Sequence, residues 1–460
     1  MWTAQTPDLS QFANTMPKVL LLCTSTAKLG EEETGAWHEE FAGPYYVFAD
    51  AGCDVTISST AGGTVPIDAA SVGQLTKNDA RFKGDPAASA KLAESVALSS
   101  LDEAALAEFD AIFLAGGHGT CVDFPDGAAA VVSTFARADK VVGAVCHGPM
   151  GLTKATLADG TPLVKGKRVC AFTDEEEQAV FGMRAGVKSA FDAGIAFSLE
   201  SRLRELGADF AGGAAWSETA VADGKLVTGQ NPMSSVKAAQ LCLFLMNPVT
   251  VVYHKGFTGR GEAPMLLLED AGVPYTMLRD MRAFKEQNKA AGRFPCFAAP
   301  ALVHGDVAMS QTTAIMYYLG NALGYAPSGA VDAVHCLQIA ENAADVWAES
   351  YTKPVDQFTA CTDRCPNGRH MSWFSELEAN LKASANGGNT YFGGGAEPTY
   401  ADFAVLNAIR TVQFMMEAQA ADALKSCPLL SAWMARIVAR PRIASYLSSC
   451  EPVLYPSKKG

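Results

Sequence analysis

A cysteine followed directly by a histidine, Cys146-His147, is the residue pair in this 460-residue chain best suited to nucleophilic chemistry. In the segment AVCHGP an apolar run ends at Val145, and Gly148 and Pro149 impose a turn and open a helix. A helix N-terminus favours an anion, so this position is expected to lower the pKa of the thiol and supply a thiolate. The adjacent histidine is a candidate base. The alternative interpretation is a small buried cysteine in a turn.

A second pair of chemically useful residues lies early in the chain, where TGAWHEEFAGPYY opens a predicted helix with Glu39 and Glu40. A carboxyl group buried near the thiol would have a raised pKa and could move a proton. The commoner role of paired glutamates is a solvated helix start, and the residues alone leave both interpretations open. A glycine-rich turn, AGGHGT at 115–120, offers backbone N–H groups to a developing oxyanion.

Apolar runs that alternate with helical patterns predict how these residues are positioned. The strand patterns are KVLLLC, CDVTIS, FDAIFLAGGHGT, KVVGAVCHGP, KRVCAFT and KLVTGQNP, and a helix is expected from about Trp37 to Ala51. This alternation predicts a doubly wound, flavodoxin-like α/β domain. Chemistry in such sheets lies beyond the carboxyl ends of the strands, where AGGHGT and AVCHGP both fall. Residues 60–100 are irregular and are interpreted as an insertion or cap.

The pattern breaks at Asn247-Pro248 and then restarts. TVVYHKG and PYTMLRD are predicted strands, and EAPMLLLEDAG is a predicted helix with Gly272 as its C-terminal cap. APALVHGDVAMS predicts two short strands, QTTAIMYYLGNALG a helix, and everything from about residue 329 is helical. The predicted organisation is a disordered lead at 1–16, a first domain at 17–246, a small α/β domain at 249–326 and an all-α bundle at 329–452.

The segments TGAWHEE, AGGHGT, AVCHGP, GKRVCAFTDEEE and LVTGQNP, in this order, resemble the PfpI and class I glutamine amidotransferase-like superfamily. The match is to its branch of stress chaperones and glutathione-independent glyoxalases (glyoxalase III), and it covers residues 17–246. The resemblance implies an active site of Cys146, His147 and Glu40, with Glu39 the alternative carboxylate. It also implies an oxyanion hole at Gly116 and Gly117, whereas the acidic run 174–177 matches a rim segment.

The chemistry implied by this resemblance is the conversion of methylglyoxal to lactate. A cysteine thiolate attacks the aldehyde to give a hemithioacetal, a base moves a proton through an enediol, and water releases lactate from the thioester. The implied enzyme is a glyoxalase III, or D-lactate dehydratase, with no metal and no cofactor. A deglycase activity on glycated proteins or nucleotides would use the same thiolate.

The second half resembles a glutathione transferase from about residue 249 to 452, with a thioredoxin-like domain before its helical bundle. The resemblance implies a cis-proline at Pro300, a glutamyl-binding pair at Gln311 and Thr312, and Tyr253 as the residue that stabilises the glutathione thiolate. The family has Gln-Ser where this chain has Gln-Thr, which keeps the hydroxyl. The loop after Tyr253 is longer than usual, so a strand aromatic packed on the bundle is the alternative. Glutathione is the implied cosubstrate of this half. Thr399 and Asp402 form a predicted capping box with a folding role.

Composition limits the partners. A net charge of −13 argues against nucleic acid or an anionic membrane, and an apolar fraction of 49% with 18% charged residues is typical of a globular protein. The chain has no apolar stretch that could span a membrane and no secretory signal, so the expected location is the cytoplasm. Twelve scattered cysteines fit reduced thiols, and CTDRC (361–365) lacks the partners of a zinc site.

The sequence therefore predicts an aldehyde-detoxifying enzyme fused to a glutathione transferase-like domain, with small dicarbonyls or other electrophiles as substrates. A homodimer is expected, because both resembled families commonly form dimers. The main alternative is a glutathione transferase acting on electrophiles, in which the first half is a redox-sensing chaperone or holdase. Peptide hydrolysis is a weaker alternative, because nothing specifies a peptide groove.

Overall fold

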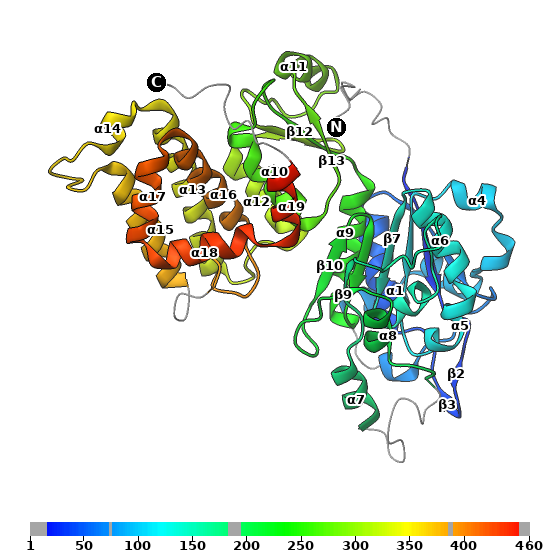
Figure 1. Ribbon diagram of the computed structural model, residues 1–460. Helices are drawn as coiled ribbons and strands as arrows, with labels where there is room; N and C mark the ends of the chain where they lie inside the picture. The colour runs from blue at the N-terminus through cyan, green and yellow to red at the C-terminus, as the bar shows by residue number, and fades with distance from the viewer. Residues whose placement is uncertain (1–15, 73–75, 183–194, 385–389, 450–460) are drawn as a thin grey trace. The chain divides into compact units, whose positions relative to one another are not determined.

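The computed structural model describes residues 16–72, 76–182, 195–384 and 390–449 (Figure 1). These residues fall into two compact units that divide between Asn247 and Pro248. Most of the predicted disordered lead, and the link between residues 183 and 194, lie outside the described residues. None of the described helices has the length and apolar character needed to cross a bilayer. The described cysteines are all free thiols.

The first unit is built on a seven-stranded sheet in the order β10-β11-β7-β6-β1-β4-β5. Neighbouring strands are parallel except for the β10–β11 pair at one edge. The strands are β1 (Lys18–Cys23), β4 (Asp54–Ser59), β5 (Val96–Ala97), β6 (Ala111–Leu114), β7 (Val141–Val145), β10 (Ala220–Asp223) and β11 (Leu226–Gly229). The α/β character predicted from the alternating pattern is confirmed.

Helices cover both faces of this sheet. Val142 and Ala144 of β7 face the core formed with α5 (Thr120–Gly127) and α6 (Ala129–Arg137). Gly143 faces the other way, toward α9 (Ser235–Met246), where a β-carbon would approach the Cys242 sulfur to 2.5 Å. Helix α1 (His38–Asp50) packs against α9, which places the start of α1 beside the carboxyl end of β7.

Two predicted segments of this unit differ from expectation. KRVCAFT forms only the short strand β8 (Arg168–Val169), which pairs with β9 (Asp209–Phe210) outside the main sheet. Its following residues are used elsewhere, because the N–H of Phe172 donates to the carbonyl oxygen of Cys146 at 3.0 Å. Residues 60–100 contain α2 (Lys77–Lys83), α3 (Pro86–Ala93) and the edge strand β5.

The remaining elements of the first unit are short or lie near its rim. They are the hairpin β2 (Lys28–Leu29) and β3 (Glu32–Glu33), α4 (Glu103–Ala107), α7 (Asp174–Gly182) and α8 (Leu199–Glu205). Helix α7 is the one that matters for the site, because it follows directly from the segment that holds the Cys146 carbonyl.

The second unit begins with a four-stranded sheet in the order β13-β12-β14-β15. The β12–β13 pair is parallel, and the other two pairs are antiparallel. The elements are β12 (Val249–Val252), α10 (Glu262–Ala271), β13 (Tyr275–Leu278), α11 (Met281–Ala290), β14 (Ala301–His304), β15 (Val307–Ser310) and α12 (Thr312–Leu323). Gly272 caps α10 with φ 65°, as predicted, and α11 was not expected.

The rest of this unit is helical, as predicted. Its helices are α13 (Ala330–Thr352), α14 (Val355–Thr359), α15 (Arg369–Ser384), α16 (Tyr400–Met415), α17 (Glu417–Ser426), α18 (Pro428–Val438) and α19 (Pro441–Ser449). The predicted capping box of Thr399 and Asp402 is present at the start of α16. The buried Asp402 also accepts a hydrogen bond from the Trp433 indole at 2.7 Å, which ties α16 to α18.

Candidate active site

Cys146 lies on a sharp turn directly after β7 and has φ 57°, a left-handed conformation that costs a non-glycine residue about 1–3 kcal/mol. Its N–H donates to the carbonyl oxygen of Gly229 at 2.9 Å, and its own carbonyl accepts from Phe172 at 3.0 Å. These two bonds fix the strained turn from both sides. The thiol is buried, with 4% of the residue exposed.

The helix expected after the turn is a five-residue 3₁₀ helix, Gly148–Leu152. Its dipole is correspondingly small, and the surroundings of the thiol are acidic. Burial, followed by the charge of Glu40 and its hydrogen bond, raises the pKa of Cys146 well above the usual range. The lowered thiol pKa predicted from a helix N-terminus is therefore wrong for the resting site. A thiolate would have to form by transfer of the proton to a neighbouring group.

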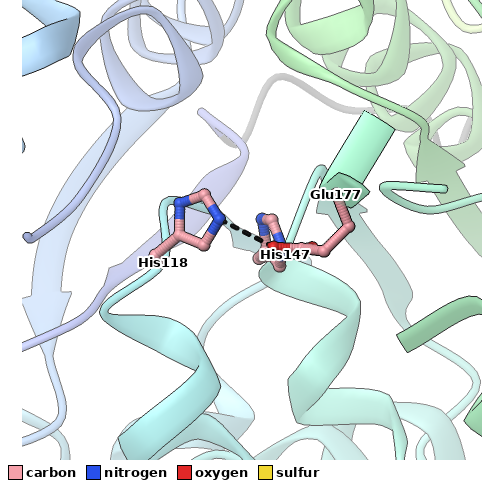
Figure 2. Close-up of side chains that lie close together, drawn as sticks. All are labelled: His118, His147 and Glu177. Atoms are coloured by element: carbon pink, nitrogen blue, oxygen red, sulfur yellow. Dashed lines mark hydrogen bonds and ion pairs between the residues drawn. The ribbon is translucent and has the colours of Figure 1, made fainter. Parts of the chain in front are cut away.

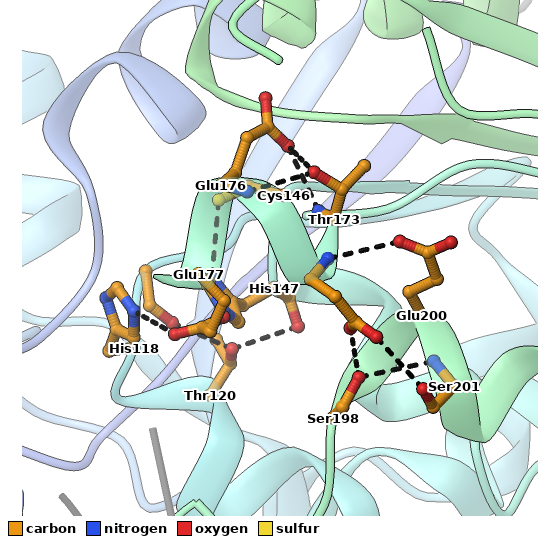
Figure 3. A network of polar contacts seen from close by, with 12 residues as sticks. His118, Thr120, Cys146, His147, Thr173, Glu176, Glu177, Ser198, Glu200 and Ser201 are labelled. Carbon is orange, nitrogen blue, oxygen red and sulfur yellow. Dashed lines mark hydrogen bonds and ion pairs between the residues drawn. The ribbon is translucent and has the colours of Figure 1, made fainter. Parts of the chain in front are cut away.

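His147 joins the thiol to an ion pair (Figure 3). Its Nδ1 lies 3.4 Å from Cys146 Sγ, and its Nε2 lies 2.7 Å from Oε2 of Glu177. Thr120 Oγ1 donates to the His147 carbonyl oxygen at 3.0 Å, and the Phe172 ring packs on the imidazole with centroids 4.6 Å apart. Cys146, His147 and Glu177 thus have the arrangement that a nucleophile, a base and an orienting carboxylate require.

Glu177 lies on α7 and contacts a second imidazole, because Nε2 of His118 is 3.0 Å from its Oε1. Burial acts to raise the pKa of this carboxyl group, but His147 and His118 together outweigh that effect and hold it well below the usual range. The carboxylate is therefore a permanent anion that can stabilise a proton on His147.

Glu40 lies in the first turn of α1 and is completely buried. The Cys146 thiol and the Gly116 N–H favour its ionised form, but burial outweighs them and raises the pKa of Glu40 well above the usual range. Neither carboxyl oxygen has a hydrogen-bond partner of normal geometry among the described residues. Glu39 points elsewhere, toward Thr76 and toward Asn78 at 3.4 Å. The structure thus places Glu40 and not Glu39 beside the thiol.

The glycine turn after β6 lies against the same site. Gly117 has φ 101°, and a β-carbon there would come within 2.3 Å of the Gly35 carbonyl oxygen. The Gly116 N–H acts on Glu40. In the part of the chain that the structure describes, the N–H groups of Gly117 and His147 donate no hydrogen bond. These two groups are free for an oxyanion, so the geometry favours Gly117 with His147 over the predicted pair of Gly116 with Gly117.

The second unit brings its predicted residues to one end of the sheet. Tyr253 follows Val252, which pairs with Ala301, the residue after Pro300. The Ala299–Pro300 peptide is cis, as the resemblance implied, and the Pro300 carbonyl oxygen accepts from Gln311 N–H at 3.3 Å.

Gln311 has φ 80°, and the next residue, Thr312, starts α12. The Thr312 hydroxyl is buried without a hydrogen-bond partner among the described residues. The Tyr253 hydroxyl accepts from Arg260 N–H at 3.1 Å, and burial raises its pKa. The tyrosine therefore keeps its proton and can donate it in a hydrogen bond.

Comparison with known proteins identifies the family of the first unit. Residues 33–178 match the DJ-1/PfpI family. Glyoxalase 3 of Candida albicans is 30% identical over 235 residues, which cover 49% of this chain and 96% of that protein. The chain belongs to the DJ-1/PfpI family. The glutathione-independent glyoxalase hsp3101 of Schizosaccharomyces pombe is 32% identical over 224 residues, covering 46% of this chain and 86% of the relative.

The second half has relatives of its own. Residues 346–450 match the glutathione S-transferase C-terminal domain. Glutathione S-transferase P of Bos taurus is 26% identical over 215 residues, which cover 46% of this chain and 97% of that enzyme. The chain is thus a fusion of a DJ-1/PfpI domain, related to glutathione-independent glyoxalases, with a glutathione transferase-like domain.

Sequence reasoning missed two residues of the DJ-1/PfpI site. Glu177 was placed in a rim segment, and the segment AGGHGT was interpreted for its glycines alone, so that His118 was given no role. Glu176, the residue before Glu177, makes different contacts. Its buried carboxylate accepts hydrogen bonds from Gln230 at 3.0 Å and Asn231 at 2.8 Å. Adjacent glutamates on a helix point to different places, and only the fold shows which one reaches His147.

Proposed function

We propose that the DJ-1/PfpI domain is a glutathione-independent glyoxalase that converts methylglyoxal to lactate. The observation that carries the proposal is the left-handed Cys146, with Sγ 3.4 Å from the His147 imidazole and beside the buried Glu40. The relatives that cover this domain are glyoxalases by name, which supports the same reaction class.

The first step is attack on the aldehyde. The Cys146 proton moves to His147 Nδ1, and the resulting imidazolium is stabilised by the permanently ionised Glu177 at 2.7 Å. The thiolate adds to the aldehyde carbon, and the N–H groups of Gly117 and His147 receive the developing oxyanion. Glu40, whose raised pKa keeps it protonated, gives its proton to that oxygen, so a neutral hemithioacetal forms.

The second step is an isomerisation. Glu40 is now an anion and removes the hydrogen from the former aldehyde carbon, which gives an enediolate. The same proton returns to the neighbouring carbon, while the hydroxyl proton on the thiol-bearing carbon moves to the other oxygen. The product is a thioester of lactic acid, an isomer of the hemithioacetal.

Hydrolysis completes the cycle. Water adds its hydroxyl to the thioester carbon and gives a proton to Glu40, and the expelled thiolate recovers its proton from His147. Glu40 therefore acts first as an acid and then as a base. This double role requires a carboxyl group that is neutral at rest, which the complete burial of Glu40 supplies.

The test is lactate formation from methylglyoxal by the intact chain without added glutathione. We expect turnover by the wild type and a loss of at least about 10³-fold in Cys146→Ala, because the nucleophile is removed. Cys361→Ala is the matched control, since this cysteine is exposed, and it should keep full activity. Equal turnover by all three proteins would refute the mechanism.

We also propose that the second half binds glutathione. The supporting observation is the Thr312 hydroxyl, buried and without a partner at the start of α12, beside the left-handed Gln311. A helix start of this kind accommodates a carboxylate such as that of the glutamyl group.

Calorimetry with glutathione tests this second proposal. Thr312→Val should weaken binding about tenfold, the value of one hydrogen bond to a charged group. Cys146→Ala should bind normally. Wild-type protein without affinity for glutathione would end this proposal and leave the first untouched.

A further inference from the structure

One cluster of side chains in the first unit has more ligating capacity than the proposed reaction uses. Within the described residues, the ring nitrogens of His118 and His147 and a carboxylate oxygen of Glu177 lie within 4.8 Å of one another (Figure 2). The proposed reaction requires one imidazole on Glu177, and none of its steps uses His118. Two imidazoles and one carboxylate are a ligand set that zinc takes in proteins.

The ligating atoms already converge on one another. His147 Nε2 is 2.7 Å from Oε2 of Glu177, and His118 Nε2 is 3.0 Å from Oε1. Neighbouring ligand atoms of a tetrahedral zinc ion lie about 3.3 Å apart, because zinc–nitrogen and zinc–oxygen distances are about 2.0–2.2 Å. The two nitrogen–oxygen separations are close to that value, and all three ligand atoms lie within 4.8 Å of one another. An ion can therefore replace the hydrogen-bonding protons between the rings and the carboxylate once the side chains close by up to about 1.5 Å.

The electrostatic surroundings favour a cation. Glu177 is held as an anion by the two imidazoles, and the whole chain carries a net charge of −13. The Glu177 side chain retains 13% of its exposed surface, whereas His147 retains 1%, so an ion would arrive from the carboxylate side.

We propose that His118, His147 and Glu177 bind a divalent transition-metal ion, zinc above all, and that its occupancy inhibits the Cys146 chemistry. The thiol is not among the ligands. Cys146 Sγ lies beside Nδ1 of His147, whereas the ion would bind at Nε2 on the opposite edge of the ring.

Inhibition follows from the tautomer that the ion imposes. A metal on Nε2 leaves the imidazole proton on Nδ1, the nitrogen that faces Cys146. His147 can then no longer accept the proton of the thiol. The inhibitory part of this inference rests on the proposed function, whereas the binding part does not.

Binding is measured first, on the intact chain stripped of metal by a chelator and titrated with zinc against a chromogenic chelator. His118→Asn and Glu177→Gln should each weaken zinc binding by more than about tenfold. Cys146→Ser and the exposed His335→Asn are controls that should bind zinc as the wild type does. Unchanged affinity in the first two variants, or lost affinity in Cys146→Ser, overturns the assignment.

A second measurement uses the wild type alone, in case the variants fold poorly. Cobalt(II) in the same site should give the visible absorption of a tetrahedral nitrogen and oxygen site, without a thiolate charge-transfer band. A thiolate band would show that the sulfur is a ligand and would overturn the proposal.

The activity measurement follows. Lactate formation should fall in proportion to zinc occupancy and return when a chelator removes the ion. Full activity with an occupied site overturns the inhibitory role. A wild type that binds zinc at this site but forms no lactate even after the metal has been removed disproves the glyoxalase proposal and leaves the metal site standing.

Discussion

Glu40 and Glu177, which both act on Cys146, differ in their partners more than in their burial. Glu40 is fully buried, and no described residue makes a hydrogen bond of normal geometry with its oxygens. Glu177 is nearly as enclosed, but each of its oxygens faces an imidazole, at 2.7 and 3.0 Å. Burial raises the pKa of the first, whereas the two imidazoles lower that of the second. One residue type therefore provides two groups of opposite pKa shift in one site, the difference on which the proposed mechanism depends.

This contrast has consequences for stability that run in opposite directions. The neutral form of Glu40 is favoured in the fold, so its contribution is present below the ordinary pKa of about 4.3 and is lost as the pH rises through the raised value. The ionised form of Glu177 is favoured, so its contribution is present above about 4.3 and is lost as the pH falls below it.

Among substitutions that test the contrast between Glu40 and Glu177, the largest effect on activity is expected from Glu40→Gln. An amide of the same shape can neither protonate the oxyanion nor remove the carbon-bound hydrogen, so kcat/KM for lactate formation should fall by about 10²–10⁴-fold. The measurement is steady-state lactate formation without glutathione. Labelling of Cys146 by an alkylating reagent checks that the thiol is still reachable. Activity within a few fold of the wild type would show that Glu40 is not the proton carrier.

Glu177→Gln should have an intermediate effect, because it removes an orienting anion and not a reacting group. The loss of its charged hydrogen bonds to His147 and His118 is expected to lower the free energy of unfolding by about 1–3 kcal/mol near neutral pH. The difference from the wild type should stay constant down to about pH 5 and shrink below about 4.3, because this carboxyl group takes up a proton in the unfolded wild type while it stays ionised in the folded one.

Chemical unfolding of the intact chain tests this, followed by pulsed hydrogen exchange of peptides from residues 141–152, which report on the first unit. Exposed Glu205→Gln on α8 is a matched control and should change stability by less than about 0.5 kcal/mol. A Glu177→Gln difference that grows on acidification would contradict a lowered carboxyl pKa.

At the first site, the local turn was predictable from the sequence, whereas the long-range contacts were not. AVCHGP was enough to predict the strained turn at Cys146, because a buried strand followed by glycine and proline permits few conformations. The pairing of His118 and His147 with Glu177 was not predictable, since the contacts join residues 59 and 30 positions apart. KRVCAFT was assigned to the sheet because its residues are apolar, yet Phe172 instead supports the Cys146 carbonyl, a contact that no local pattern encodes.

The second site depends on backbone conformation more than on residue type. The cis bond before Pro300 was implied by the order of motifs in a known family and not by any local preference of these residues, and the left-handed conformation of Gln311 was not predicted. For the pKa of the Cys146 thiol, by contrast, a local motif led to a wrong prediction. A turn that resembled a helix start implied a lowered value, whereas burial, followed by the effect of carboxyl groups distant in sequence, raises it.

The smallest effect is expected from Glu39→Gln, which tests the alternative that the sequence left open. Glu39 is adjacent to Glu40 on α1, but the helix directs its side chain toward Thr76 and Asn78 at the start of α2. Burial raises its pKa as well, so a raised value alone does not identify the proton carrier. An amide can keep hydrogen bonds to both partners, so we expect lactate formation within about threefold of the wild type and a stability change below about 1 kcal/mol. Parallel assays of Glu39→Gln and Glu40→Gln compare neighbouring residues of one type on one helix turn. A loss in Glu39→Gln as large as that in Glu40→Gln would mean that proton transfer depends on the α1–α2 contact, and the separation of roles between the two glutamates would be wrong.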